Sequence, residues 1–206
     1  MNNVQFNFKK AFFNRRLGVA EHREFQILEK ALEMIAQKGF ENLQFGDLAK
    51  RCKISRTLVH HYFKDKFELA NKLLDLSTLH LQFYVAEALS QEKDPKQHLK
   101  TYCAATLDWP ALYPKEAASL LLFVHLCTHN AEMRARNDEL STLGRQKIKL
   151  FLTQAESSTS RLDSNALIIQ TLLTGCCLSL LTENHSAKES LTLRSHCLKE
   201  CLRIAS

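Results

Sequence analysis

The sequence of 206 residues contains only 5 Gly and 3 Pro. These residues supply most tight turns, and a fold built from many short strands needs such turns repeatedly. Their scarcity argues against a β-rich fold and predicts an all-α protein. The length fits one domain, or a small domain joined to a larger one, with enough chain to bury a core. We find no internal repeat and no low-complexity segment.

Patterns typical of catalysis and metal binding are also missing. The sequence has no paired carboxylates, no nucleophile motif and no glycine-rich phosphate loop. Its seven cysteines include no C-x-x-C pair, so the pattern does not favour a disulfide framework or a zinc knuckle. We therefore expect no enzyme activity, no metal and no cofactor, and we expect most cysteines to be small core residues.

No segment has the features of a secretory signal, because polar and basic residues interrupt every apolar run near the N-terminus. The most apolar stretch, residues 166–181, is shorter than the ~20 residues of a membrane span and contains Gln170 and Thr171. We expect a cytoplasmic protein without membrane contact, in which this stretch is buried in the core or between subunits.

The stretch from Gln44 to Glu68 has the pattern of a helix, a tight turn and a second short helix. Apolar residues recur at i, i+3, i+4 and i+7, which predicts the buried face of the first helix: Phe45, Leu48, Ala49 and Cys52. Ser55 stands where the N-cap of the second helix belongs, because its hydroxyl can accept from a free amide of the first turn.

The second short helix is predicted to have two different faces. Its packing side carries Leu58, Val59 and Phe63. The opposite side carries hydrogen-bond donors and positive charge: Arg56, Thr57, His60, His61 and Lys64. A short helix of this kind is suited to a groove of DNA.

The distribution of charge agrees with a DNA-binding N-terminal part. Residues 1–72 hold 14 Lys and Arg against 8 Asp and Glu, a net charge of +6, whereas residues 73–206 hold 14 of each and have no net charge. All of the excess positive charge therefore lies on the segment that contains the two-faced helix. A basic face that serves only solubility is the alternative.

From Arg23 to about Leu74 the chain resembles the DNA-binding domain of TetR-type transcriptional regulators. The matching residues keep their spacing without a gap: Ile27, Ala31, Ile35, Gly39, Phe40, Leu48, Ala49, Ile54, Ser55, Phe63 and Lys66, with residues 62–66 the most diagnostic. The family usually has threonine at Gln44, glycine at Lys53 and tyrosine at His60. Lys53 must then hold a left-handed turn conformation, which costs ~1 kcal/mol relative to glycine.

The resemblance implies a homodimer, joined by its C-terminal helices, that binds a palindromic operator in double-stranded DNA and responds to a small-molecule effector. As a repressor, it would leave the operator when a small hydrophobic molecule binds. The implied DNA contacts are Gln44, Ser55, Arg56, Thr57, His60, His61, Tyr62, Lys64 and Lys66. Tyr62 and Lys66 are expected at the phosphate backbone.

Three domains are expected: a basic extension over residues 1–22, a helix-turn-helix domain over residues 23–72, and a helical ligand-sensing and dimerisation domain over residues 73–206. The extension is a DNA-following arm, a disordered terminus or an extra packed helix. The helices outside the helix-turn-helix are expected near residues 24–38, 66–90, 95–107, 116–130, 131–156, 164–183 and 187–204.

Pro110 and Pro114 are expected to bracket a break between two helices, beside the single tryptophan. This corner is either the wall of a ligand pocket or a plug in the core. Our candidates for the pocket are Tyr102, Trp109, Phe123 and Cys127.

Two further hypotheses remain open at this point. His125 and His129 share a helix face and could start a metal site of a hydrolase, although two histidines simply hydrogen-bonded in the interior are the alternative. Cys197 and Cys201, four residues apart, could form a thiol sensor. A DNA-binding protein that senses no ligand is a further alternative.

Overall fold

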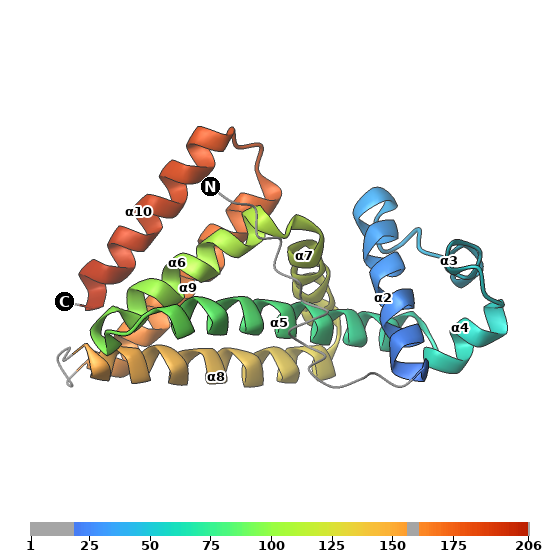
Figure 1. Cartoon of the computed structure of the whole chain (residues 1–206), viewed down its shortest axis with the longest axis horizontal. Helices are drawn as coiled ribbons and strands as arrows, with labels where there is room; N and C mark the ends of the chain where they lie inside the picture. Colours follow the sequence, from blue (N-terminus) through green and yellow to red (C-terminus); the bar gives the residue numbers. More distant parts are fainter. Residues whose placement is uncertain (1–18, 156–160, 206) are drawn as a thin grey trace. The chain divides into compact units, whose positions relative to one another are not determined.

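The computed structural model describes residues 19–155 and 161–205 (Figure 1). Within these residues the secondary structure is helical throughout and contains no strand, which confirms the all-α prediction. The helices are α2 (Val19–Lys38), α3 (Phe45–Cys52), α4 (Arg56–Tyr62), α5 (Lys66–Gln91), the short 3-10 helix η1 (Pro95–Gln97), α6 (His98–Leu112), α7 (Pro114–His129), α8 (Ala131–Gln154), α9 (Leu162–Thr182) and α10 (Ala187–Ala205).

The N-terminal helix is longer than its sequence pattern predicted. Helix α2 begins at Val19, so the last four residues of the expected extension 1–22 are helical. Residues 1–18, on which the predicted basic arm depends, lie outside the described residues, as do residues 156–160. At the other end, Gly39 follows α2 with a φ of 78°, the left-handed conformation that glycine adopts without strain.

The predicted break between Pro110 and Pro114 is confirmed, but the helix before it ends later than residue 107, where it was expected to end. Helix α6 continues through Pro110 to Leu112. Proline has no N–H to donate to the carbonyl of Thr106, but the thiol of Cys177 donates to that oxygen at 3.6 Å and replaces the missing bond. The break is at Tyr113, because Pro114 occupies the first turn of α7, where its missing N–H has no consequence.

The structure divides into two compact units. The first contains the described residues through Phe83 together with Lys115–Phe123, and the second contains Tyr84–Pro114 with the described residues from Val124 onward. Helix α5 runs without interruption past residue 72, so the predicted domain boundary coincides with no linker. The three-domain division therefore stays a proposal.

The core of the first unit is formed by the apolar faces that the sequence pattern predicted. Helix α2 buries Ile27 and Ala31, and α3 buries Leu48, each with no exposed surface. Val59 of α4 and Phe63, which follows it, are also fully buried. Burying a Val, Leu, Ile or Phe side chain contributes roughly 1.5–3 kcal/mol. Packing against α2 and α3 therefore holds the seven-residue α4, which is too short to be stable alone.

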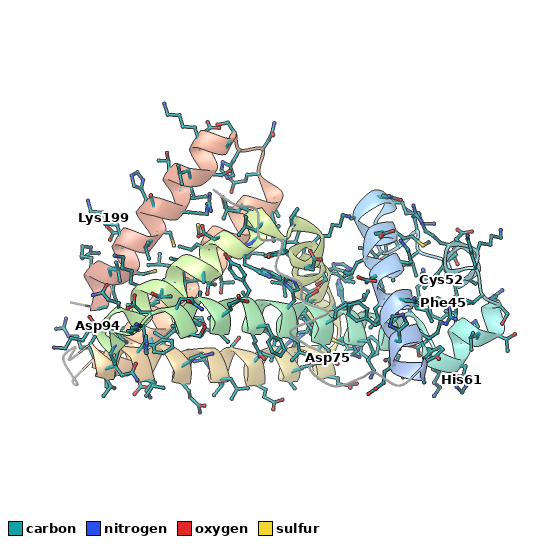
Figure 2. The ribbon with its side chains drawn as sticks, in the orientation of Figure 1. Phe45, Cys52, His61, Asp75, Asp94 and Lys199 are labelled. Carbon is teal, nitrogen blue, oxygen red and sulfur yellow. The ribbon has the colours of Figure 1, made fainter. Side chains whose placement is uncertain are left out.

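In the second unit, α9 packs against α6, α8 and α10. Its core residues come from all four helices: Leu99, Leu107, Ile148, Phe151, Leu152, Ala166, Ile169, Leu173 and Cys201. Arg194 of α10 forms an ion pair with Asp108 of α6 across this packing. The side chains of both units are drawn in Figure 2.

His80 makes the stability of the first unit depend on pH. Its side chain is 4% exposed, and burial lowers its pKa from 6.5 to about 4. Between these values the unfolded chain binds a proton that the folded chain does not, so acid destabilises the fold. We expect this residue alone to remove about 3 kcal/mol of the free energy of unfolding between pH 7 and pH 4.

Urea unfolding of the wild type and of His80→Gln over that pH range measures this effect. The glutamine variant should lack the His80 component of the loss on acidification, while both proteins share the contribution of the carboxylates. Parallel stability curves for the two proteins would contradict the assignment.

Candidate nucleic-acid interface

A left-handed residue makes the turn between α3 and α4. Lys53 has φ 54° and ψ 45°, and within the described residues it is the one non-glycine residue with a positive φ. Its N–H donates to the carbonyls of Ala49 and Lys50, and the N–H of Ile54 donates to Ala49 at 3.0 Å. The predicted conformation of Lys53 is thus confirmed, in a bonding pattern that satisfies the last carbonyls of α3.

The N-termini of α3 and α4 are capped differently. Ser55 is extended, and its hydroxyl accepts from the N–H of Leu58 at 3.1 Å, which confirms the predicted N-cap of α4. Gln44 precedes α3 in the corresponding position but forms no side-chain cap. Its side chain is exposed and is therefore accessible to another molecule.

Helix α4 has the two faces that its sequence predicted. Val59 is buried and Leu58 is half-buried, toward α2 and α3. The exposed side chains are Arg56, Thr57, His60, His61 and, just beyond the helix, Lys64. His61 is labelled in Figure 2, with Phe45 and Cys52 on the neighbouring α3. The structure thus brings all five donors to the solvent side of one short helix.

Aromatic contacts hold the position of this face relative to the core. The His60 ring lies 5.0 Å from the ring of Phe45, measured between centroids. The ring of Phe45 on α3 therefore supports the His60 side chain, which remains exposed to solvent. The rings of His61 and Tyr62 meet edge to face at 5.5 Å. Tyr62 is half-buried against the core, which leaves its role at phosphate a proposal.

A reciprocal cap starts the helix that follows. The carboxylate of Asp65 accepts from the N–H of Glu68 at 2.8 Å, as predicted. The carboxylate of Glu68 accepts in turn from the N–H of Lys64, also at 2.8 Å. The link between α4 and α5 is therefore fixed by two hydrogen bonds to charged acceptors.

Lys66 lies at the first position of α5, where the sequence placed a phosphate contact. Its ammonium donates to the carbonyl of Glu41 at 3.1 Å and lies 5.9 Å from the centroid of the Phe40 ring. An ammonium has three N–H donors, so this bond leaves others for a phosphate. Lys66 thereby also connects α5 to the loop between α2 and α3.

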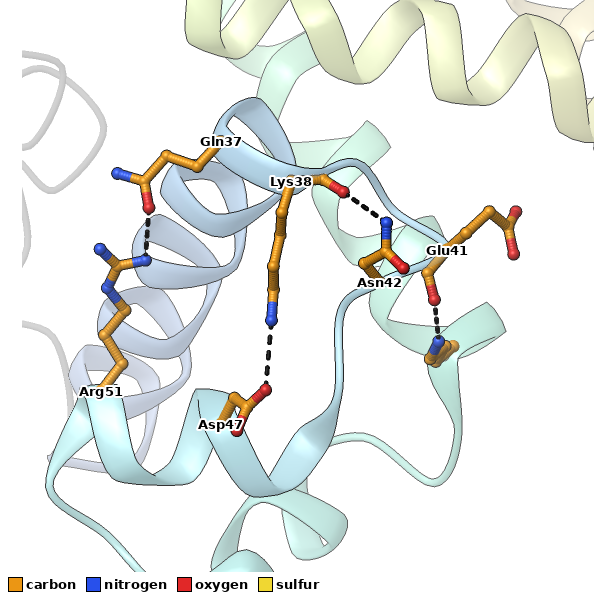
Figure 3. A network of polar contacts seen from close by, with 7 residues as sticks. Gln37, Lys38, Glu41, Asn42, Asp47 and Arg51 are labelled. Carbon is orange, nitrogen blue, oxygen red and sulfur yellow. Dashed lines mark hydrogen bonds and ion pairs between the residues drawn. The ribbon is translucent and has the colours of Figure 1, made fainter.

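Further polar contacts brace α3 against α2 (Figure 3). Lys38 pairs with Asp47 at 3.2 Å, and Arg51 donates to the side-chain oxygen of Gln37 at 2.8 Å. The side chain of Asn42 donates to the carbonyl of Lys38 at 2.9 Å. Lys38 and Arg51 are thus engaged within the protein.

Two exposed lysines that the sequence analysis did not select lie near α4. Lys50 is in the last turn of α3, and Lys53 precedes the N-cap of α4 by two residues. Charge alone does not distinguish them from solvated surface lysines; the turn geometry places them beside the two-faced helix. We add both to the candidate phosphate contacts.

Comparison with known proteins identifies the family whose DNA-binding domain this helix-turn-helix matches. Residues 27–73 match the family described as bacterial regulatory proteins, tetR family. Residues 27–73 form a DNA-binding domain of the TetR family. Members are DNA-binding regulators and not enzymes, and the resemblance of residues 23–74 is thereby confirmed.

Curated relatives are similar to about half of this chain. The "Probable acrEF/envCD operon repressor" of Escherichia coli K12 is 29% identical over 112 residues, which are 53% of this chain and 50% of that protein. The chain thus spans about half the length of the curated relatives it matches.

Solved structures extend the likeness to the fold of nearly the whole chain. A TetR transcription regulator from Haloarcula marismortui has a TM-score of 0.73 at 14% identity, and the match covers 90% of this chain and 97% of that one. The structure of AibR in complex with isovaleryl coenzyme A and operator DNA has a TM-score of 0.66 at 15% identity. This match covers 86% of this chain and 97% of the AibR chain.

The candidate ligand residues are divided between the two units. Phe123 belongs to the first unit and is buried. Tyr102, Trp109 and Cys127 belong to the second, where Trp109 is 1% exposed. Burial raises the pKa of Tyr102 to about 12, and the thiol of Cys127 donates to the carbonyl of Met133 at 3.4 Å.

His125 and His129 lie on the surface, so the expectation that they are interior residues is wrong. Both are exposed, with ring centroids 5.2 Å apart and the rings edge to face. Over the described ranges, no group of three or more His, Cys, Asp or Glu residues is arranged to hold a metal ion. The alternative of a metal-dependent enzyme is not supported.

Helix α9 is less buried than its composition predicted. It is 21 residues long, and in the described part of the chain it alone has the length and composition of a membrane-crossing helix, so the prediction that it is too short is wrong. Only Ala166, Ile169, Leu173 and Cys176 are buried. Leu167 and Ile168 are 51% and 46% exposed.

Proposed function

We propose that this TetR-family protein is a ligand-responsive, sequence-specific regulator of transcription, and that it acts in the cytoplasm as a repressor released from its operator by a small hydrophobic molecule. The observation that carries the proposal is the solvent-exposed donor face of α4, which is capped by Ser55 and held by the fully buried Val59 and Phe63. A short rigid helix with this face fits the major groove.

The proposed roles on this surface differ between residues. Arg56, Thr57, His60 and His61 meet base edges or nearby phosphates, because they stand out from the exposed side of α4. The remaining proposed contacts hold the phosphate backbone: Gln44, Ser55, Lys50, Lys53, Tyr62, Lys64 and Lys66. Contacts to phosphate position a protein on DNA, and contacts to bases give it specificity.

We propose that two copies pair through α9 and α10. Between residues 165 and 181 the exposed residues of α9 follow one helical stripe: Leu167, Ile168, Thr171, Thr174 and Gly175. The exposed aliphatic side chains of Leu167 and Ile168 are unfavourable in water and are covered when two copies meet. At Gly175 an added Cβ would have no heavy atom within 4 Å, so the single chain leaves this position open for a close helix approach.

The ligand proposal centres on the second unit, near Tyr102, Trp109 and Cys127. The supporting observation is the gathering of aromatic groups there, with the ring of Tyr102 5.5 Å from that of Phe151. AibR is named in complex with a small molecule as well as with DNA, which supports a ligand response by analogy. Titration of Trp109 fluorescence with compounds that release DNA tests this assignment.

Selection of bound fragments from random double-stranded DNA tests the function itself. The expected result is a palindrome whose half-sites lie about 10–10.5 base pairs, or a multiple of that, apart between centres, since two symmetry-related helices must enter successive major grooves. Recovery of fragments without a shared motif would contradict sequence-specific regulation. A single half-site would contradict the homodimer and leave the DNA-binding role of α4 intact.

A further inference from the structure

Four thiols meet where α6, α9 and α10 pack together in the second unit. This thiol cluster consists of Cys103, Cys176, Cys197 and Cys201. Hydrogen bonds connect its members in a row, from Cys103 to Cys201, from Cys201 to Cys197, and from Cys197 to Cys176. Three of the four are buried, whereas Cys197 is partly exposed. Within the cluster, a molecule from solution therefore reaches Cys197 first.

The hydrogen bonds also favour Cys197 as the reactive sulfur. The thiol of Cys197 donates to the carbonyl of Leu172 on α9 at 3.5 Å, which holds its sulfur against the turn of α9 that leads to Cys176. The hydrogen bonds of Cys197 with Cys176 and Cys201 lower its pKa against the opposing effect of burial, whereas the bond to Cys197, together with burial, raises the pKa of Cys176. Since the thiolate is the nucleophile in thiol chemistry, these contacts favour Cys197 as the member that reacts first.

Geometry decides which neighbour Cys197 can bond to. Cys201 follows it by four residues on α10, and side chains at that spacing have Cβ atoms about 5–6 Å apart. A disulfide requires a Cβ–Cβ distance of about 3.5–4.5 Å, so this pair would distort the helix. Cys176 comes from the neighbouring α9, and its thiol already contacts the Cys197 sulfur.

We propose that Cys197 is a site of reaction with hydroperoxides and that it then forms a disulfide with Cys176, which joins α10 to α9. In the first step the Cys197 sulfur attacks one peroxide oxygen, the O–O bond breaks, and the other oxygen leaves as an alcohol, or as water from hydrogen peroxide. Cys197 is then a sulfenic acid. The Cys176 sulfur attacks it, the S–O bond breaks, and water leaves with the Cys176 proton. Two thiols lose two electrons and the peroxide gains them.

A metal ion is the other partner that four thiols suggest. Within residues 19–155 and 161–205 no group of three or more ligating side chains is arranged to hold one. Pairwise thiol contacts without a shared coordination centre fit disulfide formation better than metal binding. The cluster therefore favours oxidation.

Peptide mapping of the full-length protein tests the proposal. Reduced protein, freed of reductant, is treated with a small excess of hydrogen peroxide, its remaining thiols are blocked with iodoacetamide, and it is digested with trypsin without reduction. Trypsin separates the candidates: residues 195–199 contain Cys197, 200–203 contain Cys201, 101–115 contain Cys103, and 162–188 contain Cys176 and Cys177. We expect 195–199 joined to 162–188, and titratable thiols falling from seven to five per chain.

Matched serine variants assign the bond. Cys197→Ser and Cys176→Ser should each abolish the joined peptide, whereas Cys177→Ser and Cys127→Ser should retain it, because neither residue is in the cluster. A bond from 195–199 to 200–203 or 101–115, a disulfide between two chains on a non-reducing gel, or first oxidation at Cys52 or Cys127 would overturn the proposal. The measurement uses no DNA, so its outcome is independent of the proposed function.

Discussion

Gly175→Glu is expected to convert the protein to monomers and to weaken operator binding by at least about 100-fold. In the single chain the change is well tolerated, because Gly175 is exposed, an added Cβ meets no atom within 4 Å, and glutamate is a better helix former by about 0.5 kcal/mol. In the proposed dimer the same carboxylate is buried between helices, at a cost of several kcal/mol. Each ~1.4 kcal/mol corresponds to a tenfold loss.

Sedimentation velocity and fluorescence anisotropy with a selected DNA fragment measure the two effects, and circular dichroism checks that the helices remain. Leu112→Glu is the matched control, because Leu112 is 55% exposed on α6, outside the proposed interface. It should leave the dimer and DNA binding intact. A Gly175→Glu protein that stays dimeric and binds DNA normally would place the interface elsewhere. Leu172→Glu is a poorer test, because Leu172 packs against the core of its own unit.

Arg56→Ala is expected to cost about 1–3 kcal/mol of DNA-binding free energy per half-site and to relax the preference at one base position, since an arginine on the exposed face of α4 can bind a guanine edge with two hydrogen bonds. Lys66→Ala should instead weaken binding to all sequences alike. The slope of log K against log[salt] should become shallower by roughly 1 per subunit, because each phosphate that a lysine neutralises contributes about 0.9 to it.

Affinity measured over a series of salt concentrations, on the selected palindrome and on a scrambled fragment, separates these outcomes. Lys100→Ala, at an exposed lysine of α6, is the matched control and should leave the slope unchanged. Lys66 also donates to the carbonyl of Glu41, so thermal unfolding must show that the variant remains folded at the assay temperature. An unchanged slope in a folded Lys66→Ala protein would contradict the phosphate contact.

The local features of the helix-turn-helix could be predicted because neighbouring residues determine them. The Ser55 cap needs only an amide three residues away, and the cap of Asp65 on Glu68 has the same span. The left-handed conformation of Lys53 was implied by the resemblance, since the family usually has glycine at this position. Each of these interactions is complete within about five residues, so a sequence pattern contains all of its participants.

The misjudged features depend on residues far apart in the chain. A sequence pattern cannot show that Cys177 supplies the hydrogen bond that Pro110 removes, since 71 positions separate Cys177 from Thr106, whose carbonyl accepts that bond. The exposure of His125 and His129 depends on how α7 packs in the folded chain, which the apolar repeat along its sequence does not determine. The thiol cluster gathers members of three helices, of which only the pair on α10 could be recognised beforehand.

The left-handed lysine also has an evolutionary consequence. Glycine at position 53 would relieve about 1 kcal/mol of backbone strain. The protein with Lys53 is therefore less stable toward unfolding than the same protein with glycine there would be. Selection removes a destabilising residue only when it brings the protein below its working threshold, and the buried core of the first unit provides a margin above it. At Lys53 the chain therefore has lower stability and, in return, a cation on the proposed DNA-binding surface.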